Sequence, residues 1–222
     1  WEFLNLFSRR GIEVYRPLAM VLAFFIPFAV MSSLEYLYFA VIVLAVFIYY
    51  FRRNCQNQAA LGTAVTVLGM VYIVWFFSYL LKIRSLEQGP FWIFYTILIV
   101  KGGDAGAYFI GTKYGKVKLI ESISPNKSWE GAWGGLVTTV ILSLVSAIYL
   151  KGVSLVHLLI LGIFIGVIAQ LGDLIESLIK RNVGVKDSGN IPGLGGIFDV
   201  IDSLVLTMPF VYFYTTYMLG LS

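Results

Sequence analysis

The chain has 222 residues, of which 59% are hydrophobic and 13% are charged, and its formal net charge is +4. Soluble globular domains carry roughly 25% charged residues, so this composition excludes an ordinary soluble domain and indicates an integral membrane protein. No basic stretch lies outside the apolar segments and their loops, so the positive charge does not indicate nucleic-acid binding. The single cysteine, Cys55, excludes an intrachain disulfide and a cysteine metal site.

Apolar stretches long enough to cross a bilayer recur along the chain, since about 20 helical residues span its hydrocarbon core. We therefore predict an all-α fold, a polytopic integral membrane helical bundle with about seven spans in this chain. Their approximate ranges are 18–33, 35–51, 58–80, 90–110, 130–150, 154–179 and 197–219. The chain opens on Trp1 in a segment typical of the end of a helix, so we expect the N-terminus to be missing.

Lys and Arg residues are distributed unevenly among the loops between these spans. The loops at 8–16, 52–57, 111–128 and 180–195 hold twelve of the sixteen Lys and Arg residues. The alternating set of loops holds Lys82, Arg84 and Lys151. The positive-inside rule places the basic set at the cytoplasmic face, so a polar site beside those loops is expected to face the cytoplasm.

The segment 172–203 gathers carboxylates and cations between two predicted spans. Charged side chains at membrane depth cost about 2.5 kcal/mol or more unless they are paired or bind ions, so this cluster predicts a functional site. One stripe of the first helix carries Asp173, Glu176, Ser177 and Lys180, and one face of the second carries Asp199 and Asp202. Facing carboxylates at one depth can hold a hard divalent cation such as Mg²⁺, with Asp173 and Asp199 as the preferred ligands.

Two further patterns predict phosphate binding near these carboxylates. Gly193, Gly195 and Gly196 precede the last span, and open backbone N–H groups at a helix N-terminus suit an anionic phosphate. Counter-charge would come from Lys180, Arg181 and Lys186.

The upstream segment SPNKSWEG, residues 124–131, contains a second phosphate candidate, Lys127. Pro125 and Asn126 are expected to form a turn, and Ser128 to cap a helix whose third residue is Gly131. A purely structural reading stays open for these charges, which could pair with one another to hold helices together, as Lys101 could with Asp104.

Metal-binding carboxylates, cations and a glycine-rich turn are the groups that phosphoryl or nucleotidyl transfer requires, because electrostatic stabilisation dominates that chemistry. Their depth in the membrane indicates that one substrate is a lipid.

These motifs resemble the signature of the phosphatidate cytidylyltransferase family, also called CDP-diacylglycerol synthases. The family pattern S-x-x-K-R-x4-K-D, P-G-H-G-G and D-R-x-D is matched by Ser177, Lys180, Arg181, Lys186, Asp187, Pro192, Gly193, Gly195, Gly196, Asp199 and Asp202. The upstream pattern D-x-x-A-Y-x-x-G and S-P-x-K-(S/T)-x-x-G is matched by Asp104, Ala107, Tyr108, Gly111, Ser124, Pro125, Lys127, Ser128 and Gly131. Leu194 and Val200 depart from it, since the family usually has His and Arg there.

The resemblance implies a Mg²⁺-dependent enzyme that makes CDP-diacylglycerol and pyrophosphate from CTP and phosphatidate, for phospholipid biosynthesis, in a multi-pass bacterial inner-membrane bundle of about nine helices. The implied metal ligands are Asp173 and Asp199, and the catalytic set adds Asp202, Lys186 and Asp187. The implied substrate-binding residues are Asp104, Ser124, Lys127, Ser128, Ser177, Lys180, Arg181, Gly193, Gly195 and Gly196. The number of metal ions, one or two, and homodimer formation stay open.

Within one continuous bundle, residues 1–90 are expected to supply membrane spans and residues 91–222 the catalytic region. Three alternatives stay open. An inactive or altered-substrate homologue is motivated by Leu194 and Val200. A CTP-dependent polyprenol kinase would need a base for its hydroxyl acceptor. A transporter could also use intramembrane charges, although no inverted repeat is evident.

Overall fold

The computed structural model describes residues 1–53, 58–193 and 195–221, so Cys55 and Leu194 lie outside the described residues. The described chain is helical apart from one short β-hairpin. Its elements are α1 (Glu2–Arg9), α2 (Arg16–Val30), α3 (Glu35–Arg53), α4 (Ala59–Gly69), a π-helical turn η1 (Met70–Trp75), α5 (Phe76–Ser85), α6 (Gly89–Tyr114), β1 (Lys118–Ile120), β2 (Ser124–Ser128), α7 (Trp129–Val145), a 3₁₀ turn η2 (Ser146–Ile148), α8 (Leu155–Asn182) and α9 (Ile197–Tyr217).

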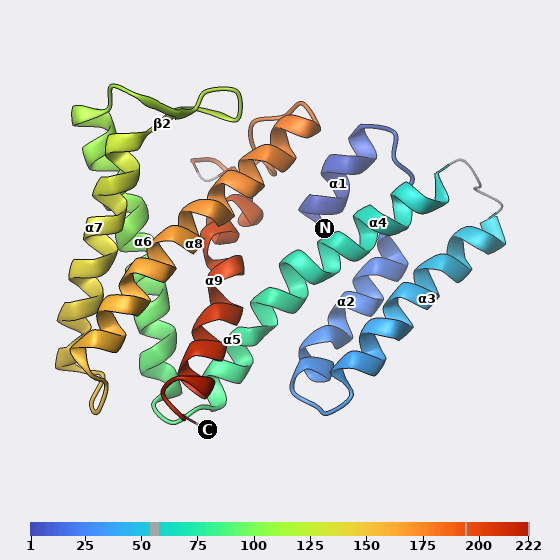
Figure 1. Ribbon diagram of the computed structural model, residues 1–222. Helices are drawn as coiled ribbons and strands as arrows, with labels where there is room; N and C mark the ends of the chain where they lie inside the picture. The colour runs from blue at the N-terminus through green and yellow to red at the C-terminus, as the bar shows by residue number, and fades with distance from the viewer. Residues whose placement is uncertain (54–57, 194, 222) are drawn as a thin grey trace.

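Six helical stretches within the described ranges are long and apolar enough to cross a membrane, which confirms the prediction of an all-α polytopic membrane protein. They are Glu35–Arg52, Ala59–Ser85, Gly89–Tyr114, Trp129–Ile148, Leu155–Asn182 and Ile197–Tyr217. The first predicted span is a shorter apolar helix, Arg16–Val30. The third is one continuous rod that runs through α4, η1 and α5 (Figure 1).

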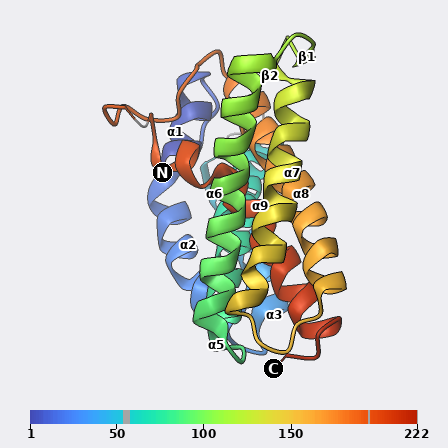
Figure 2. The ribbon, with the colours of Figure 1, turned by 90° about the vertical axis from the view of Figure 1, so that its left-hand side faces the viewer.

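Helices α6 and α7 form a closely packed antiparallel pair, with α8 against α7 and α9 in the middle of the bundle (Figures 1 and 2). Small residues allow this close approach, as at other helix contacts in membranes. A Cβ atom added to Gly131 of α7 would lie 3.1 Å from the Gly111 Cα atom of α6. A Cβ atom added to Gly103 of α6 would lie 2.5 Å from the Thr139 Cγ2 atom of α7. The two helices therefore pack closely together beside α8.

The segment before α7 differs from its prediction in one respect. The turn expected at Pro125 and Asn126 is wrong, because both residues belong to strand β2, which pairs antiparallel with β1. Proline lacks an N–H group, and a two-stranded hairpin tolerates it because each strand has an unpaired edge. The cap is confirmed, since the Ser128 hydroxyl accepts a hydrogen bond of 3.1 Å from the Gly131 N–H.

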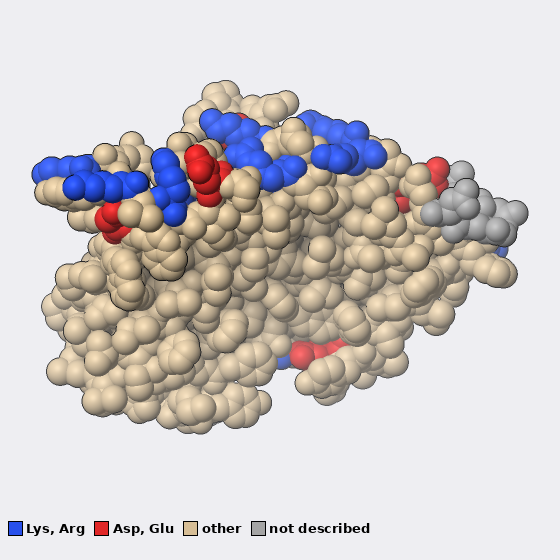
Figure 3. All heavy atoms as spheres, turned by 45° about the horizontal axis from the view of Figure 1, so that its top comes forward, with Lys and Arg blue, Asp and Glu red and all other residues tan. Residues whose placement is uncertain are grey.

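Positive charge gathers at one end of the bundle. The α1–α2 connection, the hairpin and the α8–α9 segment all lie at this end (Figure 1), and Lys and Arg side chains form a band across it (Figure 3). At the opposite end Glu35 of α3 pairs with Lys82 of α5 at 2.5 Å. Loops that were grouped by charge in the sequence are therefore neighbours in space.

Candidate active site

Three carboxylates meet where α8 and α9 cross. Asp173 and Glu176 lie one turn apart on α8 and Asp202 lies on α9, with one oxygen of each within 4.8 Å of the others. Gly172 makes this possible, since a Cβ atom there would lie 2.8 Å from the Asp202 carbonyl oxygen. Carboxylates packed this closely repel one another unless a cation compensates them. Within the described residues, this acidic group can hold a metal ion.

The burial of Glu176 supports the fit of a cation. This residue is only 1% exposed, and its Oε2 atom lies 2.7 Å from Lys180 Nζ, although neither side-chain oxygen has a partner with hydrogen-bond geometry among the described residues. A buried carboxylate is costly unless positive charge offsets it, and the charge of Lys180 is shared with Asp199. Oxygen ligands are also those that hard divalent cations prefer.

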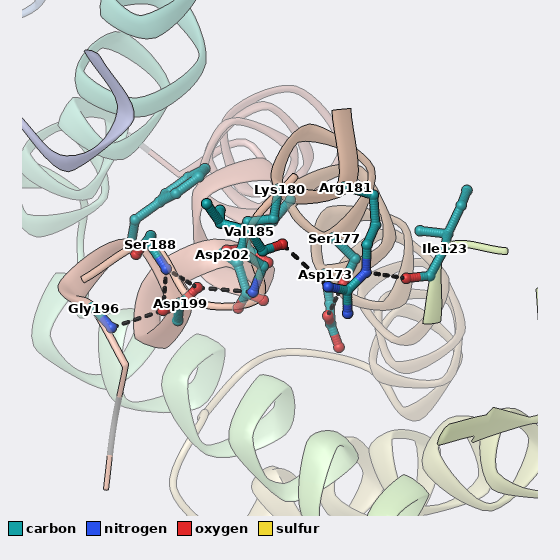
Figure 4. Close-up of polar contacts among 12 residues, drawn as sticks. Ile123, Asp173, Ser177, Lys180, Arg181, Val185, Ser188, Gly196, Asp199 and Asp202 are labelled. Carbon is teal, nitrogen blue, oxygen red and sulfur yellow. Dashed lines mark hydrogen bonds and ion pairs between the residues drawn. The ribbon is translucent and has the colours of Figure 1, made fainter. Parts of the chain in front are cut away.

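Two lysines already contact the acidic group. Lys127, from strand β2, lies with its Nζ atom 2.6 Å from Asp173 Oδ2. Lys180, one turn beyond Glu176, lies 2.7 Å from Glu176 Oε2 and 2.8 Å from Asp199 Oδ1. Figure 4 shows Lys180 and Asp199 side by side between α8 and α9. Two of the predicted phosphate-binding lysines, Lys127 and Lys180, therefore contact carboxylates directly, and Lys186 contacts none among the described residues.

Asp199 is held by hydrogen bonds and an ion pair next to the acidic group. Its Oδ2 atom accepts hydrogen bonds from the N–H groups of Ser188 at 2.9 Å and Gly196 at 2.7 Å, and its Oδ1 atom contacts Lys180 (Figure 4). In the described structure Asp202, and not Asp199, belongs to the acidic group that includes Asp173. The geometry thus favours Asp202 as the partner of Asp173, and a role for Asp199 as a metal ligand stays a prediction.

A cavity of about 500 Å³ opens beside the acidic group, between α6, the hairpin, α7 and α8. Five predicted site residues line it, namely Asp104, Ser124, Lys127, Ser128 and Asp173. Lining residues that the predictions missed include Thr112, Lys118, Asn126 and Gln170. The Gln170 amide N–H donates a 3.0 Å hydrogen bond to the Ala132 carbonyl oxygen, which fixes this side chain between α8 and α7. The volume of the cavity lies in the range of small-molecule binding sites.

Asp104 is held from two sides at the base of this cavity. Lys101 Nζ lies 3.0 Å from Asp104 Oδ2, which confirms the pairing suggested by the sequence. The Ser203 hydroxyl, from α9, donates to the same oxygen at 3.1 Å. Since Ser203 follows Asp202 directly, this contact joins the cavity to the acidic group.

The glycine-rich loop does not have the open amides that were expected. The Gly196 N–H donates to Asp199, and the Ile197 and Phe198 N–H groups donate to the carboxylate of Glu2, from α1, at 3.1 and 2.8 Å. The expectation of unencumbered N–H groups at this helix end is therefore wrong. Substrate binding by Gly193, Gly195 and Gly196 stays a prediction. No local pattern in the sequence pointed to Glu2.

The remaining predicted residues differ in how closely they approach the acidic group. Arg181 donates hydrogen bonds of 3.1 Å to the carbonyl oxygens of Ile123 and Val185 (Figure 4). Lys186 and Asp187 are exposed and make no side-chain hydrogen bond or ion pair with the described parts of the chain. The Ser177 hydroxyl lies 3.5 Å from Asp173 Oδ1. Their predicted roles stay predictions, and Leu194 lies outside the described residues.

The chain is similar to known proteins over most of its length. A family model described as the cytidylyltransferase family matches residues 1–218. The chain belongs to the cytidylyltransferase family. Membership of this family confirms the resemblance and makes the chain a member of a group of nucleotidyltransferases.

Several related proteins are named phosphatidate cytidylyltransferases. The chain is 40% identical over 185 residues to a phosphatidate cytidylyltransferase of Bacillus subtilis, covering 82% of this chain and 68% of that protein. It is 42% identical to one of Staphylococcus saprophyticus and 43% identical to one of Haemophilus influenzae, over 67% and 57% of this chain. The matches span only 57% and 46% of those two proteins.

Proposed function

We propose that this protein transfers the cytidylyl group of CTP to phosphatidate, giving CDP-diacylglycerol and pyrophosphate. The observation that carries the proposal is the acidic group of Asp173, Glu176 and Asp202, in contact with lysines and beside a 500 Å³ cavity at the charged end of a membrane bundle. Several of its relatives are named phosphatidate cytidylyltransferases, and its family is the cytidylyltransferase family.

In this proposal the nucleotide binds in the cavity, and the lipid approaches the acidic group from the apolar side of the bundle. Lys118 and Lys127 line the cavity, so a polyanionic nucleotide is compensated there, with its α-phosphate next to Asp173. The lipid reaches the same carboxylates from the apolar flank of the bundle. The two reacting phosphates thereby meet in a defined orientation, which removes much of the entropic cost of a bimolecular reaction.

The reaction needs no protein nucleophile. A phosphatidate phosphate oxygen forms a bond to the α-phosphorus of CTP, and the bond between the α-phosphorus and the bridging oxygen of the pyrophosphate breaks. The attacking phosphate is already ionised, so no base has to remove a proton. Lys127 and Lys180 neutralise charge on the phosphates as pyrophosphate leaves. Asp173, Asp202 and Glu176 are the residues that would hold a Mg²⁺ ion, which when bound would supply Lewis-acid stabilisation of the same charge.

The site is proposed to open to the cytoplasm, where CTP is available. The support is the band of Lys and Arg side chains at the end of the bundle that carries the hairpin and the α8–α9 segment (Figure 3). Basic loops face the cytoplasm in multi-pass membrane proteins.

The test is product formation by the purified protein in detergent with CTP, Mg²⁺ and phosphatidate, followed by lipid mass spectrometry. We expect CDP-diacylglycerol and pyrophosphate in equal amounts, and no product when Mg²⁺ is removed with a chelator. A phosphorylated lipid and CDP would instead indicate a kinase, and no lipid product under any condition would refute the proposal.

A pair of lysine variants makes this test specific for the site. Lys127→Ala removes the cation that contacts Asp173, and kcat/KM for CTP should fall about 100-fold. The control is Lys113→Ala, since Lys113 lies at the end of α6 and contacts the Tyr114 ring. Equal effects of the two substitutions would show that general surface charge, and not the site, determines the rate.

A further inference from the structure

Glu2, in the first turn of α1, places its carboxylate against the start of α9. Its Oε1 atom accepts a hydrogen bond of 3.1 Å from the Ile197 N–H. Its Oε2 atom accepts hydrogen bonds from the Phe198 N–H at 2.8 Å and from the Ser188 hydroxyl at 3.1 Å. The first N–H groups of a helix lack partners within the helix, so this distant carboxylate acts as their cap. The side chain that caps α9 thus comes from nearly 200 residues earlier in the chain.

The glycines next to α9 leave room for this carboxylate. A Cβ atom added to Gly196 would lie 2.6 Å from Glu2 Oε2, and one added to Gly189 would lie 3.1 Å from Glu2 Oε1. A Cβ atom added to Gly195 would similarly lie 2.5 Å from Asp199 Oδ2. Two protein carboxylates, one from α1 and one from α9, therefore fill the space that these glycines provide.

Packing holds α1 in the position that this contact requires. Its apolar side chains, Phe3, Leu4, Leu6 and Phe7, are all buried. The Phe3 ring meets the Phe198 ring edge-on, with centroids 6.0 Å apart. It also lies against Gly69 of α4, where an added Cβ atom would be 2.6 Å from Phe3 Cδ1. The Glu2 carboxylate is thus presented by a docked helix and not by a loose end.

Ser188 joins Glu2 to the candidate active site. Its hydroxyl donates to Glu2, while its backbone N–H donates to Asp199 Oδ2 at 2.9 Å. Asp199 contacts Lys180, and Lys180 contacts Glu176 of the acidic group. Glu2 touches none of the three carboxylates in that group, so any influence on them passes through these intermediate contacts.

We propose that Glu2 is a positioning residue of the site: by fixing the start of α9 and the Ser188 hydroxyl, it sets the position of Asp199 and, through Lys180, of the metal-binding carboxylates. The inference rests on the proposed function for its kinetic consequence. Groups that orient metal ligands without touching the metal typically change metal affinity or activity 10- to 100-fold when they are removed. It assigns a role in the site to the part of the chain that was expected to supply membrane spans alone.

The test compares Glu2→Gln with Glu13→Gln, both in the full chain. Glutamine keeps the size of the side chain but replaces one acceptor oxygen by an NH₂ donor. A glutamine side chain therefore cannot accept hydrogen bonds from both α9 amides and the Ser188 hydroxyl together. Glu13 is an exposed carboxylate in the same N-terminal region, so its substitution is a matched control for loss of charge. Thermal unfolding and size-exclusion profiles establish that each variant is folded.

Two measurements are made on the folded protein: steady-state kinetics with CTP and phosphatidate, and binding of Mn²⁺ alone, followed by electron paramagnetic resonance. For Glu2→Gln we expect kcat to fall about tenfold and the Mn²⁺ dissociation constant to rise about tenfold, while the Glu13→Gln variant matches the unsubstituted protein. The metal-binding measurement needs no turnover, so it tests Glu2 even if CDP-diacylglycerol is not the product.

Unchanged Mn²⁺ binding and kcat in folded Glu2→Gln would overturn the inference. A loss of activity that only follows the loss of folded protein, with normal Mn²⁺ affinity in the folded fraction, would also overturn it, because it would assign Glu2 to stability alone. An unsubstituted protein that binds Mn²⁺ but forms no CDP-diacylglycerol would instead refute the proposed function, with the Mn²⁺ comparison still deciding the role of Glu2.

Discussion

The two halves of the bundle differ in where charged side chains from separate elements meet. Both halves contain buried hydroxyls that donate to carbonyl oxygens one turn back, as Thr66 does to Gly62 and Thr96 to Trp92. In the half from α1 to α5, Lys82 and Glu35 meet at one end of the bundle, whereas in the half from α6 to α9 contacts such as Lys127 with Asp173 surround the carboxylates of the candidate site. Hydroxyls bonded within one helix satisfy the backbone locally, whereas contacts between elements fix positions in space. Contacts between elements that surround the acidic group therefore position the candidate site.

The largest expected effect on turnover comes from comparing one carboxylate substitution in each half. Asp202→Asn, in the acidic group, should lower kcat/KM on the order of 10³-fold, because a bound metal supplies several kcal/mol of stabilisation to the transition state. Glu35→Gln, which breaks the ion pair with Lys82 at the opposite end, should lower the melting temperature but leave turnover per folded molecule unchanged. If both variants lost turnover equally, the comparison between the halves would fail.

An intermediate effect is expected from the contact between α8 and α9. Gly172→Ala places a methyl group 2.8 Å from the Asp202 carbonyl oxygen, so the helices must separate. We expect a loss of about 1–3 kcal/mol in the free energy of unfolding and at least about a tenfold loss of kcat. Chemical unfolding in detergent and the lipid assay measure the two quantities. Leu171→Ala, at a neighbouring position that is 49% exposed, should change neither by as much.

The smallest effect concerns a contact that crosses between the halves. The Tyr72 hydroxyl, in the π-helical turn, lies 3.4 Å from the Gly172 carbonyl oxygen, which is long for a hydrogen bond. Tyr72→Phe should therefore cost about 0.5 kcal/mol of stability and change kcat less than about threefold. A much larger kinetic effect, at unchanged stability, would place this hydroxyl in the reaction and move the boundary of the active half.

The spans were predictable because their signal is local and strong. Continuous apolar stretches and alternating loop charge identify helices and their common end, and the cap at Ser128 followed from four consecutive residues. The hairpin was missed, since β1 has three residues and β2 contains Pro125, so neither has a strand pattern. The first predicted span, 18–33, is the 15-residue helix Arg16–Val30, which begins and ends a few residues earlier than predicted.

The sequence predicted several carboxylates and lysines that lie together in the structure, but not which of them contact one another. Asp199 and Asp202 share one face of α9, and spacing alone could not decide which of them meets Asp173. That choice depends on the close approach at Gly172. The contact from Glu2 to Ser188 spans 186 residues, and no periodicity reports a contact of that kind. Motifs thus indicated several site residues, whereas tertiary packing determines which residues contact one another.

The hairpin has a mechanical consequence for the cavity. Two short strands are only marginally stable alone in water, so the hairpin depends on its contacts with the rest of the bundle. One contact is the hydrogen bond from the Arg181 guanidinium to the Ile123 carbonyl oxygen, and another is the ion pair of Lys127 with Asp173. Both contacts join the hairpin to α8. In the proposed reaction, phosphates that draw Lys127 away from Asp173 would leave the hairpin attached to α8 through Arg181, so the cavity would widen beside Asp173 while the hairpin stays in place.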